Sequence, residues 1–102
     1  MKRISYGGST ILTGDSIADA LLDYATALAR AGSADHVRVP GLGPLGRVEL
    51  FDLVIGPASQ VYAENSLGED EIFDEAFVAD LRHRMRVAAA GRLGEGTGLV
   101  GG

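Results

Sequence analysis

The chain has 102 residues, which gives room for one domain with a single hydrophobic core. It has no cysteine, so disulfides, thiolate zinc sites, iron–sulfur clusters and cysteine nucleophiles are excluded. The net charge of −5 has the wrong sign for a general nucleic-acid binder, and no apolar run approaches the length of a membrane helix. We therefore expect a cytoplasmic protein without a nucleic-acid partner, a membrane anchor, a metal or a cofactor.

The first predicted element is a β-hairpin at the start of the chain. A two-residue Gly-Gly turn at residues 7–8 pairs Ile4 with Ile11 and Tyr6 with Ser9. This register places Ile4, Tyr6 and Ile11 on one face of the hairpin. We expect that face to be the core side, because the opposite face is half polar.

A helix is predicted over residues 16–31, with Asp15 as its N-cap and Gly32 as its stop. Its apolar residues recur with helical period in two neighbouring stripes, which leaves only a narrow polar face. The stripes are Ile17, Leu21, Tyr24, Leu28 and Ala31, and beside them Ala18, Leu22, Ala25 and Ala29. So wide an apolar arc predicts that the helix packs on a sheet and also contacts a second helix or a partner chain.

Three strands are predicted after this helix. Residues 36–40 alternate like a half-exposed strand that ends at its proline. Residues 47–55 are the longest predicted strand, with a bulge at Phe51 and Asp52 to explain apolar residues on both faces. A shorter strand is predicted over residues 59–63.

A second helix is predicted to begin near Ser66, whose spacing to Glu69 fits a capping box, with Asp70 as a competing cap. Its apolar face repeats every four residues, and its acidic residues precede its basic ones, as the helix dipole favours. That face comprises Phe73, Phe77, Leu81 and Met85, with Ala76 and Ala88. The helix is expected to end at Gly91. Residues 91–102 contain six glycines and are predicted to be a disordered tail.

These elements predict one α+β domain over residues 1–90 and a flexible glycine-rich tail over residues 91–102. The order β-β-α-β-β-(β)-α favours a small antiparallel sheet with both helices packed on one face. The other face of the sheet would remain open to solvent or to a second subunit.

We interpret two patterns, one rich in glycine and one acidic, as features of the fold rather than as binding sites. Residues 41–48 spell G-x-G-x-x-G-x-V, a spacing that lets a backbone approach phosphates. A strand rather than a helix follows the third glycine, so we interpret the motif as a hairpin turn. Asp15, Asp19 and Asp23 share one helical face, which we interpret as a cap and a solvated stripe rather than a metal site.

The cluster Arg82-His83-Arg84-Met85-Arg86 is the only basic one. Arg82 and Arg86 share a helical face with His83 beside it, so these three residues are a candidate surface for an anion or an acidic partner. Favourable placement at a helix C-terminus explains the cluster equally well. Neither this histidine nor His36 completes a catalytic set, and we predict that the protein is not an enzyme.

The chain ends in Gly101-Gly102, which resembles the terminal dipeptide of ubiquitin-like modifiers and of the small sulfur carriers with a β-grasp fold. In those proteins the dipeptide threads a narrow enzyme channel so that its carboxylate can be adenylated. The resemblance implies attachment chemistry at Gly101 and Gly102.

Three functions are therefore open. We predict first a non-catalytic protein-interaction module that self-associates as a homodimer, because the first helix is apolar on two sides and the sheet is incompletely covered. The alternatives are a modifier or sulfur carrier acting through the terminal Gly-Gly, and a small-molecule or anion-binding protein.

Overall fold

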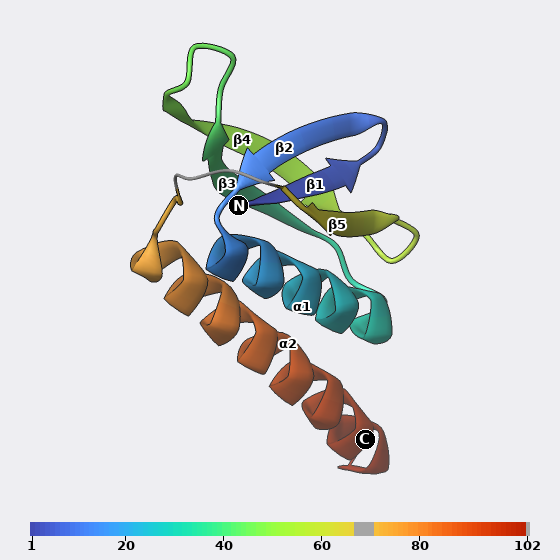
Figure 1. The fold of residues 1–102 in the computed structure, drawn as a ribbon. Coiled ribbons are helices and arrows are strands. Elements are labelled where there is room, and N and C mark those ends of the chain that lie inside the picture. Colours follow the sequence, from blue (N-terminus) through green and yellow to red (C-terminus); the bar gives the residue numbers. More distant parts are fainter. Residues whose placement is uncertain (67–70, 102) are drawn as a thin grey trace.

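The computed structural model describes residues 1–66 and 71–101, with side chains described as far as residue 90. In this part the chain forms an antiparallel five-stranded sheet and two helices, which confirms the predicted α+β fold (Figure 1). The elements are β1 Lys2–Tyr6, β2 Ser9–Thr13, α1 Asp15–Ala31, β3 Asp35–Leu42, β4 Val48–Ile55, β5 Val61–Asn65 and α2 Glu75–Gly101.

The strands lie in the order β4-β3-β2-β1-β5, so β4 and β5 are the two edges of the sheet. Both helices lie on the same side of the sheet, as Figure 1 shows, and α2 runs along α1. No described element covers the other side. We call that uncovered side the outer face.

The β1–β2 hairpin has the predicted register. Ile4 is opposite Ile11 and Tyr6 is opposite Ser9. The two turn glycines have φ angles of 54° and 82°, which side chains rarely adopt and which match the right-handed twist of the strands. Ile4 and Ile11 are buried in the core and Tyr6 is half-buried against it, so the predicted core face is confirmed.

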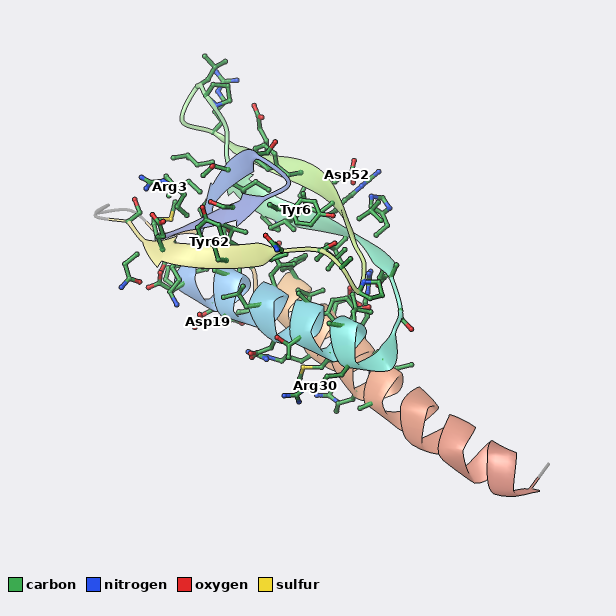
Figure 2. The ribbon with its side chains drawn as sticks, turned by 90° about the vertical axis from the view of Figure 1, so that its right-hand side faces the viewer. Arg3, Tyr6, Asp19, Arg30, Asp52 and Tyr62 are labelled. Atoms are coloured by element: carbon green, nitrogen blue, oxygen red, sulfur yellow. The ribbon has the colours of Figure 1, made fainter. Side chains whose placement is uncertain are left out.

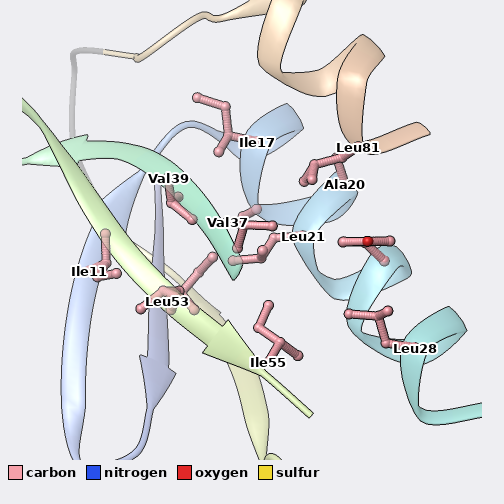
Figure 3. Packing of buried hydrophobic residues seen from close by; sticks show 13 residues of the cluster. Ile11, Ile17, Ala20, Leu21, Leu28, Val37, Val39, Leu53, Ile55 and Leu81 are labelled. Atoms are coloured by element: carbon pink, nitrogen blue, oxygen red, sulfur yellow. The ribbon is translucent and has the colours of Figure 1, made fainter. Parts of the chain in front are cut away.

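The core lies between the sheet and α1, and α1 is buried on two sides as its double stripe predicts (Figure 3). One side of α1 contacts β1, β3 and β5, and the other contacts α2. The fully buried side chains of the cluster come from all three layers. They include Ile17 and Leu21 of α1, Val37 and Val39 of β3, Ile55 of β4, and Leu81 of α2.

The two ends of α1 differ in how well the sequence predicts them. Gly32 is left-handed with φ 63°, and the following Ser33 N–H bonds to the Leu28 carbonyl, so the predicted glycine stop is confirmed. Asp15 is not the N-cap, because Gly14 occupies that position without a side-chain hydrogen bond. The reason is tertiary, since the Ile72 carbonyl lies against Gly14 and the Glu71 carboxylate accepts the Asp15 N–H.

The strands β3 and β4 pair without interruption from Asp35 opposite Ile55 to Leu42 opposite Val48. The bulge predicted at Phe51 and Asp52 is therefore wrong. Apolar residues occur on both faces of β4 because the outer face of this strand is itself apolar and exposed. The strand β3 does not end at Pro40 as predicted but continues to Leu42. The Pro40 carbonyl accepts a 2.6 Å hydrogen bond from the buried Thr13 hydroxyl of β2, which holds this part of β3 against β2.

The helix α2 begins later than predicted. Its first turn is capped by Asp74, whose Oδ1 accepts the Phe77 N–H at 2.9 Å. The predicted cap Ser66 instead extends the pairing of β5 with β1 by donating its N–H to the Met1 carbonyl, and Glu69 and Asp70 lie outside the described residues. Phe73 precedes the helix and is 79% exposed, so it does not belong to the apolar face with Leu81.

The helix α2 also continues to Gly101, past the predicted end at Gly91. Glycine costs about 1 kcal/mol relative to alanine in a helix but keeps its N–H donor, so it does not stop a helix as proline does. Gly102 and the side chains from residue 91 onward lie outside the described residues. The flexible tail over residues 91–102 stays a prediction.

The close approach of Ile72 to Gly14 generates a prediction. A Cβ on Gly14 would lie 1.9 Å from the Ile72 carbonyl oxygen, so Gly14→Ala must displace the segment before α2 from the start of α1. We expect the free energy of unfolding to fall by roughly 1–3 kcal/mol, as in other overpacked sites. Thermal and urea unfolding measure this change.

The matched control is Gly56→Ala. A Cβ there meets the Ala34 Cβ at 3.7 Å and the Ser59 Oγ at 4.0 Å, which are ordinary contacts. We expect its stability to stay within about 0.5 kcal/mol of the wild type. Equal stability of the two variants would contradict the proposed fit between Gly14 and Ile72.

Candidate interaction surface

The outer face carries side chains from all five strands that point away from α1. In Figure 2, Arg3, Asp52 and Tyr62 lie on this side, whereas Asp19 and Arg30 belong to α1. The strand pairing places Arg38 beside Asp52 and Pro40 beside Leu50 on the same face. The face is therefore a mixed surface of apolar and charged groups, and not the uniformly polar face of a solvated sheet.

The apolar part of the outer face is concentrated on the edge strand β4. Val48, Leu50 and Val54 are 58%, 62% and 62% exposed, and we call these three residues the β4 apolar row. Leu12 and Leu42, which pair across β2 and β3, are half-buried on the same face. Gathered aliphatic side chains on a strand face, unlike single ones, are typical of an interaction surface.

A compensated charge cluster interrupts the β4 apolar row. Asp52 Oδ1 accepts a 2.9 Å hydrogen bond from Arg38 Nε and lies 2.9 Å from His36 Nε2. The hydrogen bond from Arg38, followed by that of His36, holds the pKa of Asp52 below its ordinary value. Asp52 is thus ionised at neutral pH and has its counter-charge beside it on the face.

The three residues of the predicted basic surface differ in their contacts within the chain. Arg82 Nη1 lies 2.5 Å from Asp23 Oδ2 of α1, so its charge is engaged in the contact between the helices. His83 and Arg86 are exposed on α2. An anion or acidic partner at Arg82, His83 and Arg86 stays a prediction, with one of its two arginines already paired within the chain.

The three aspartates on α1 bind three different cationic groups. Asp15 lies 3.2 Å from the Met1 amino group, Asp19 lies 2.6 Å from Lys2 Nζ, and Asp23 pairs with Arg82. The stripe is therefore ion-paired as well as solvated. Among the described residues, no three metal-ligating side chains converge.

The glycine motif forms the β3–β4 hairpin turn, as we interpreted it. The Gly43 N–H bonds to the Arg47 carbonyl at 2.8 Å, and Gly46 adopts a φ of 74°. The Glu49 carboxylate lies against Gly43, where an added Cβ would meet it at 2.4 Å. A carboxylate in this position repels a phosphate and occupies the space that the glycine leaves.

One polar network was not predicted from the sequence. The Tyr24 hydroxyl donates to Asp35 Oδ2 at 2.5 Å, and Arg84 Nη1 lies 3.1 Å from the same oxygen and 3.2 Å from the His36 carbonyl. We call Tyr24, Asp35 and Arg84 the interlayer network, because they join α1, β3 and α2. No spacing in the sequence connects them, since only the fold brings the three elements together.

The interlayer network shifts the pKa values of its members. Partial burial, together with the hydrogen bond to Asp35, raises the pKa of Tyr24 to about 12. Burial alone would raise the pKa of Asp35, but hydrogen bonds from Tyr24, the His36 N–H and Arg84 outweigh it and hold that pKa below its ordinary value. The network therefore contains an ionised carboxylate at neutral pH.

Two of the open hollows on the described part of the chain have volumes in the range of ligand sites. One of about 500 Å³ lies beside the β1–β2 turn and is lined by hydroxyl groups, including those of Tyr6, Ser59 and Tyr62, and by no charged side chain. The other, of about 690 Å³, lies between α1 and α2, and Asp23 in its wall is already paired with Arg82. Arg30 also lines the second hollow, but neither hollow is an enclosed site.

No family model, curated protein or solved structure matches the chain. None of the helices in the described part of the chain combines the length and the apolar character needed to cross a membrane. Gly101 is the last residue of α2 and Gly102 lies outside the described residues. The attachment chemistry implied for Gly101 and Gly102 therefore stays a prediction.

The interlayer network predicts a pH-dependent contribution to stability. Because the pKa of Asp35 is lower in the folded chain than its ordinary value of 3.8, its ionised form stabilises the fold above that pH. This contribution is lost as the pH falls through the folded pKa. We expect Asp35→Asn to lower the melting temperature at pH 7 and to differ little from the wild type near pH 2.5.

The control for this prediction is Asp19→Asn, which removes the carboxylate of an exposed ion pair with Lys2. We expect it to change stability by less than about 1 kcal/mol at pH 7. If the difference between Asp35→Asn and the wild type were the same at both pH values, the network would not act through the ionised carboxylate.

Proposed function

We propose that this protein is a non-catalytic protein-interaction module that self-associates through the β4 side of its sheet. The observation that carries the proposal is the exposure of the β4 apolar row. Val48, Leu50 and Val54 each leave more than half of their surface in water. Strands with this composition normally bury both faces or pack one of them against another layer.

The energetics favour association at this place. Burying a valine or leucine side chain completely stabilises a contact by about 1.5–3 kcal/mol. Two copies would contribute six such side chains, each already partly buried in the monomer. Even partial burial of these side chains favours association, although the loss of translational and rotational freedom offsets a large part of it.

The charges on the outer face also support the proposal. Asp52 is the acidic side chain that interrupts the row, and it carries its own counter-charge from Arg38. A carboxylate without a partner would have to lose its hydration when a second surface covers it, at high cost. The paired carboxylate can remain beside the contact with much of that cost already offset.

The other candidate functions find less support. Arg82 and Arg84 are engaged with Asp23 and Asp35, so the basic cluster presents only part of its charge to a ligand. The hollow beside the β1–β2 turn has hydroxyl groups but no charge. The β4 apolar row gathers three exposed side chains on one strand face, whereas the other exposed large apolar residues come from separate segments: Leu45, Tyr62, Phe73 and Val87.

The test is the molar mass in solution as a function of concentration. We expect sedimentation equilibrium or light scattering to give 10.6 kDa in dilute solution and twice that mass at high micromolar concentration. Leu50→Glu places a negative charge in the row and should weaken the dimer at least about tenfold, since desolvating that charge costs more than about 1.4 kcal/mol.

The matched control is Val87→Glu, which changes a similarly exposed aliphatic side chain on α2. It should dimerise like the wild type. Circular dichroism and thermal unfolding establish that both variants are folded. A wild-type chain that remains at 10.6 kDa at the highest attainable concentration would contradict the proposed function.

A further inference from the structure

The mode of self-association follows from β4, so this inference rests on the proposed function. β4 is an edge strand of eight residues whose pairing with β3 is uninterrupted. Among the described elements, none pairs with its other side. A row of main-chain donors and acceptors is therefore exposed along the whole strand.

Two hydrogen bonds show which residues of β4 direct their main-chain groups to the free side. The Pro40 carbonyl accepts from Thr13 on the β2 side, so Pro40 and its partner Leu50 do not hydrogen-bond each other. The Arg47 carbonyl, by contrast, accepts from Gly43 on the β3 side.

Because successive residues of a strand alternate in direction, the odd-numbered residues of β4 bond to β3. The even-numbered residues have their N–H and C=O groups at the free edge. These residues are Val48, Leu50, Asp52 and Val54.

The edge at β4 has few of the features that keep edge strands apart. It has no lysine, proline or bulge, and its pairing with β3 is regular; its charged side chains are Glu49 and Asp52, and Asp52 is paired with Arg38. The opposite edge, β5, has five residues and ends in Glu64 and Asn65. A short edge with polar residues at its end pairs less readily, whereas β4 is long, regular and largely apolar.

We propose that β4 pairs antiparallel with β4 of a second copy of this chain, so that the two sheets become one continuous sheet. Residues opposite each other in a sheet point to the same face, so each outward residue of β4 must meet an outward residue of the second copy. The outward residues of β4 are even-numbered, so an even-numbered residue must pair with an even-numbered one. In every pair, the two residue numbers therefore add up to an even value. The two-fold axis is then perpendicular to the sheet, and the helices of both copies lie on the same side.

The charges on β4 select the register. A pairing centred on Phe51 places Leu50 opposite Asp52 of the second copy and Val48 opposite Val54 of the second copy. No acidic residue then faces another. A pairing centred on Asp52 is equally long but places two carboxylates directly opposite, which is destabilising. We therefore assign the register centred on Phe51, which also brings the two β4 apolar rows side by side.

The first experiment is amide hydrogen exchange of the wild-type chain by NMR at low and high concentration. We expect the N–H groups of Val48, Leu50, Asp52 and Val54 to exchange at least about tenfold more slowly in the dimer. The N–H groups of Phe51 and Leu53, which bond to β3, should be protected at both concentrations. A dimer formed by packing outer face on outer face would leave the even-numbered amides in fast exchange.

The matched variants are Leu50→Pro and Leu50→Ala. Proline at this position removes an N–H that points to the free edge, and edge strands tolerate proline there. Alanine shortens the side chain but keeps the N–H. We expect Leu50→Pro to be a folded monomer, whereas Leu50→Ala still dimerises with an affinity reduced by a smaller factor. Equal dimerisation of both variants would overturn the edge pairing.

A distance measurement does not depend on the folding of the proline variant. The chain has no cysteine, so Val54→Cys provides a single attachment point for a spin label. The register centred on Phe51 separates the two Cα atoms at position 54 by about 21 Å, and the register centred on Asp52 by about 14 Å.

The outcomes separate the two proposals. A distance near 21 Å with protected even-numbered amides supports the inference. A dimer with any other distance, or with those amides in fast exchange, overturns the edge pairing in this register and leaves self-association standing. A chain that stays monomeric contradicts the proposed function and the inference together.

Discussion

The burial of α1 between the sheet and α2 is the packing constraint on which the rest of the structure depends. Ile17 and Leu21 are fully buried in the middle of the core, and Leu81 of α2 closes that core from the far side. Because α1 uses both of its apolar stripes, both helices are committed to one side of the sheet. The outer face and the β4 edge are uncovered for this reason.

The segment before α2 holds this arrangement together by capping two helices at once. The Glu71 carboxylate accepts the Asp15 N–H at the start of α1, and the Asp74 carboxylate accepts the Phe77 N–H at the start of α2. Negative charge is favourable at both positions, because each helix has its positive dipole end there. The interlayer network ties α2 to β3 further along, so the second helix is fixed at two separate points.

The sequence predicts those features that depend on neighbouring residues. The hairpin register and the Gly32 stop follow from local turn chemistry and are confirmed. The predicted cap at Asp15 is wrong because Ile72, which is distant in sequence, packs against Gly14. The predicted bulge at Phe51 is wrong because apolar residues of β4 also occur on the uncovered face of the sheet. The interlayer network has no signal at all, since Arg84 and Asp35 are far apart in sequence. In the sequence, the β4 apolar row shows only as a break in the alternation of apolar and polar residues.

The net charge of −5 bears on why association would involve β4 rather than another surface. Two copies repel at long range, but this repulsion is screened beyond about 10 Å at ordinary salt concentration. At contact distance the charges near the interface decide, and on β4 the negative charge of Asp52 is offset by Arg38. The acidic side chains of α1 are likewise paired with cations, but they lie on a helix whose main-chain groups are satisfied internally. Only at a sheet edge do compensated charge, exposed aliphatic side chains and unpaired main-chain groups coincide, and among the edges of the described sheet β4 combines all three.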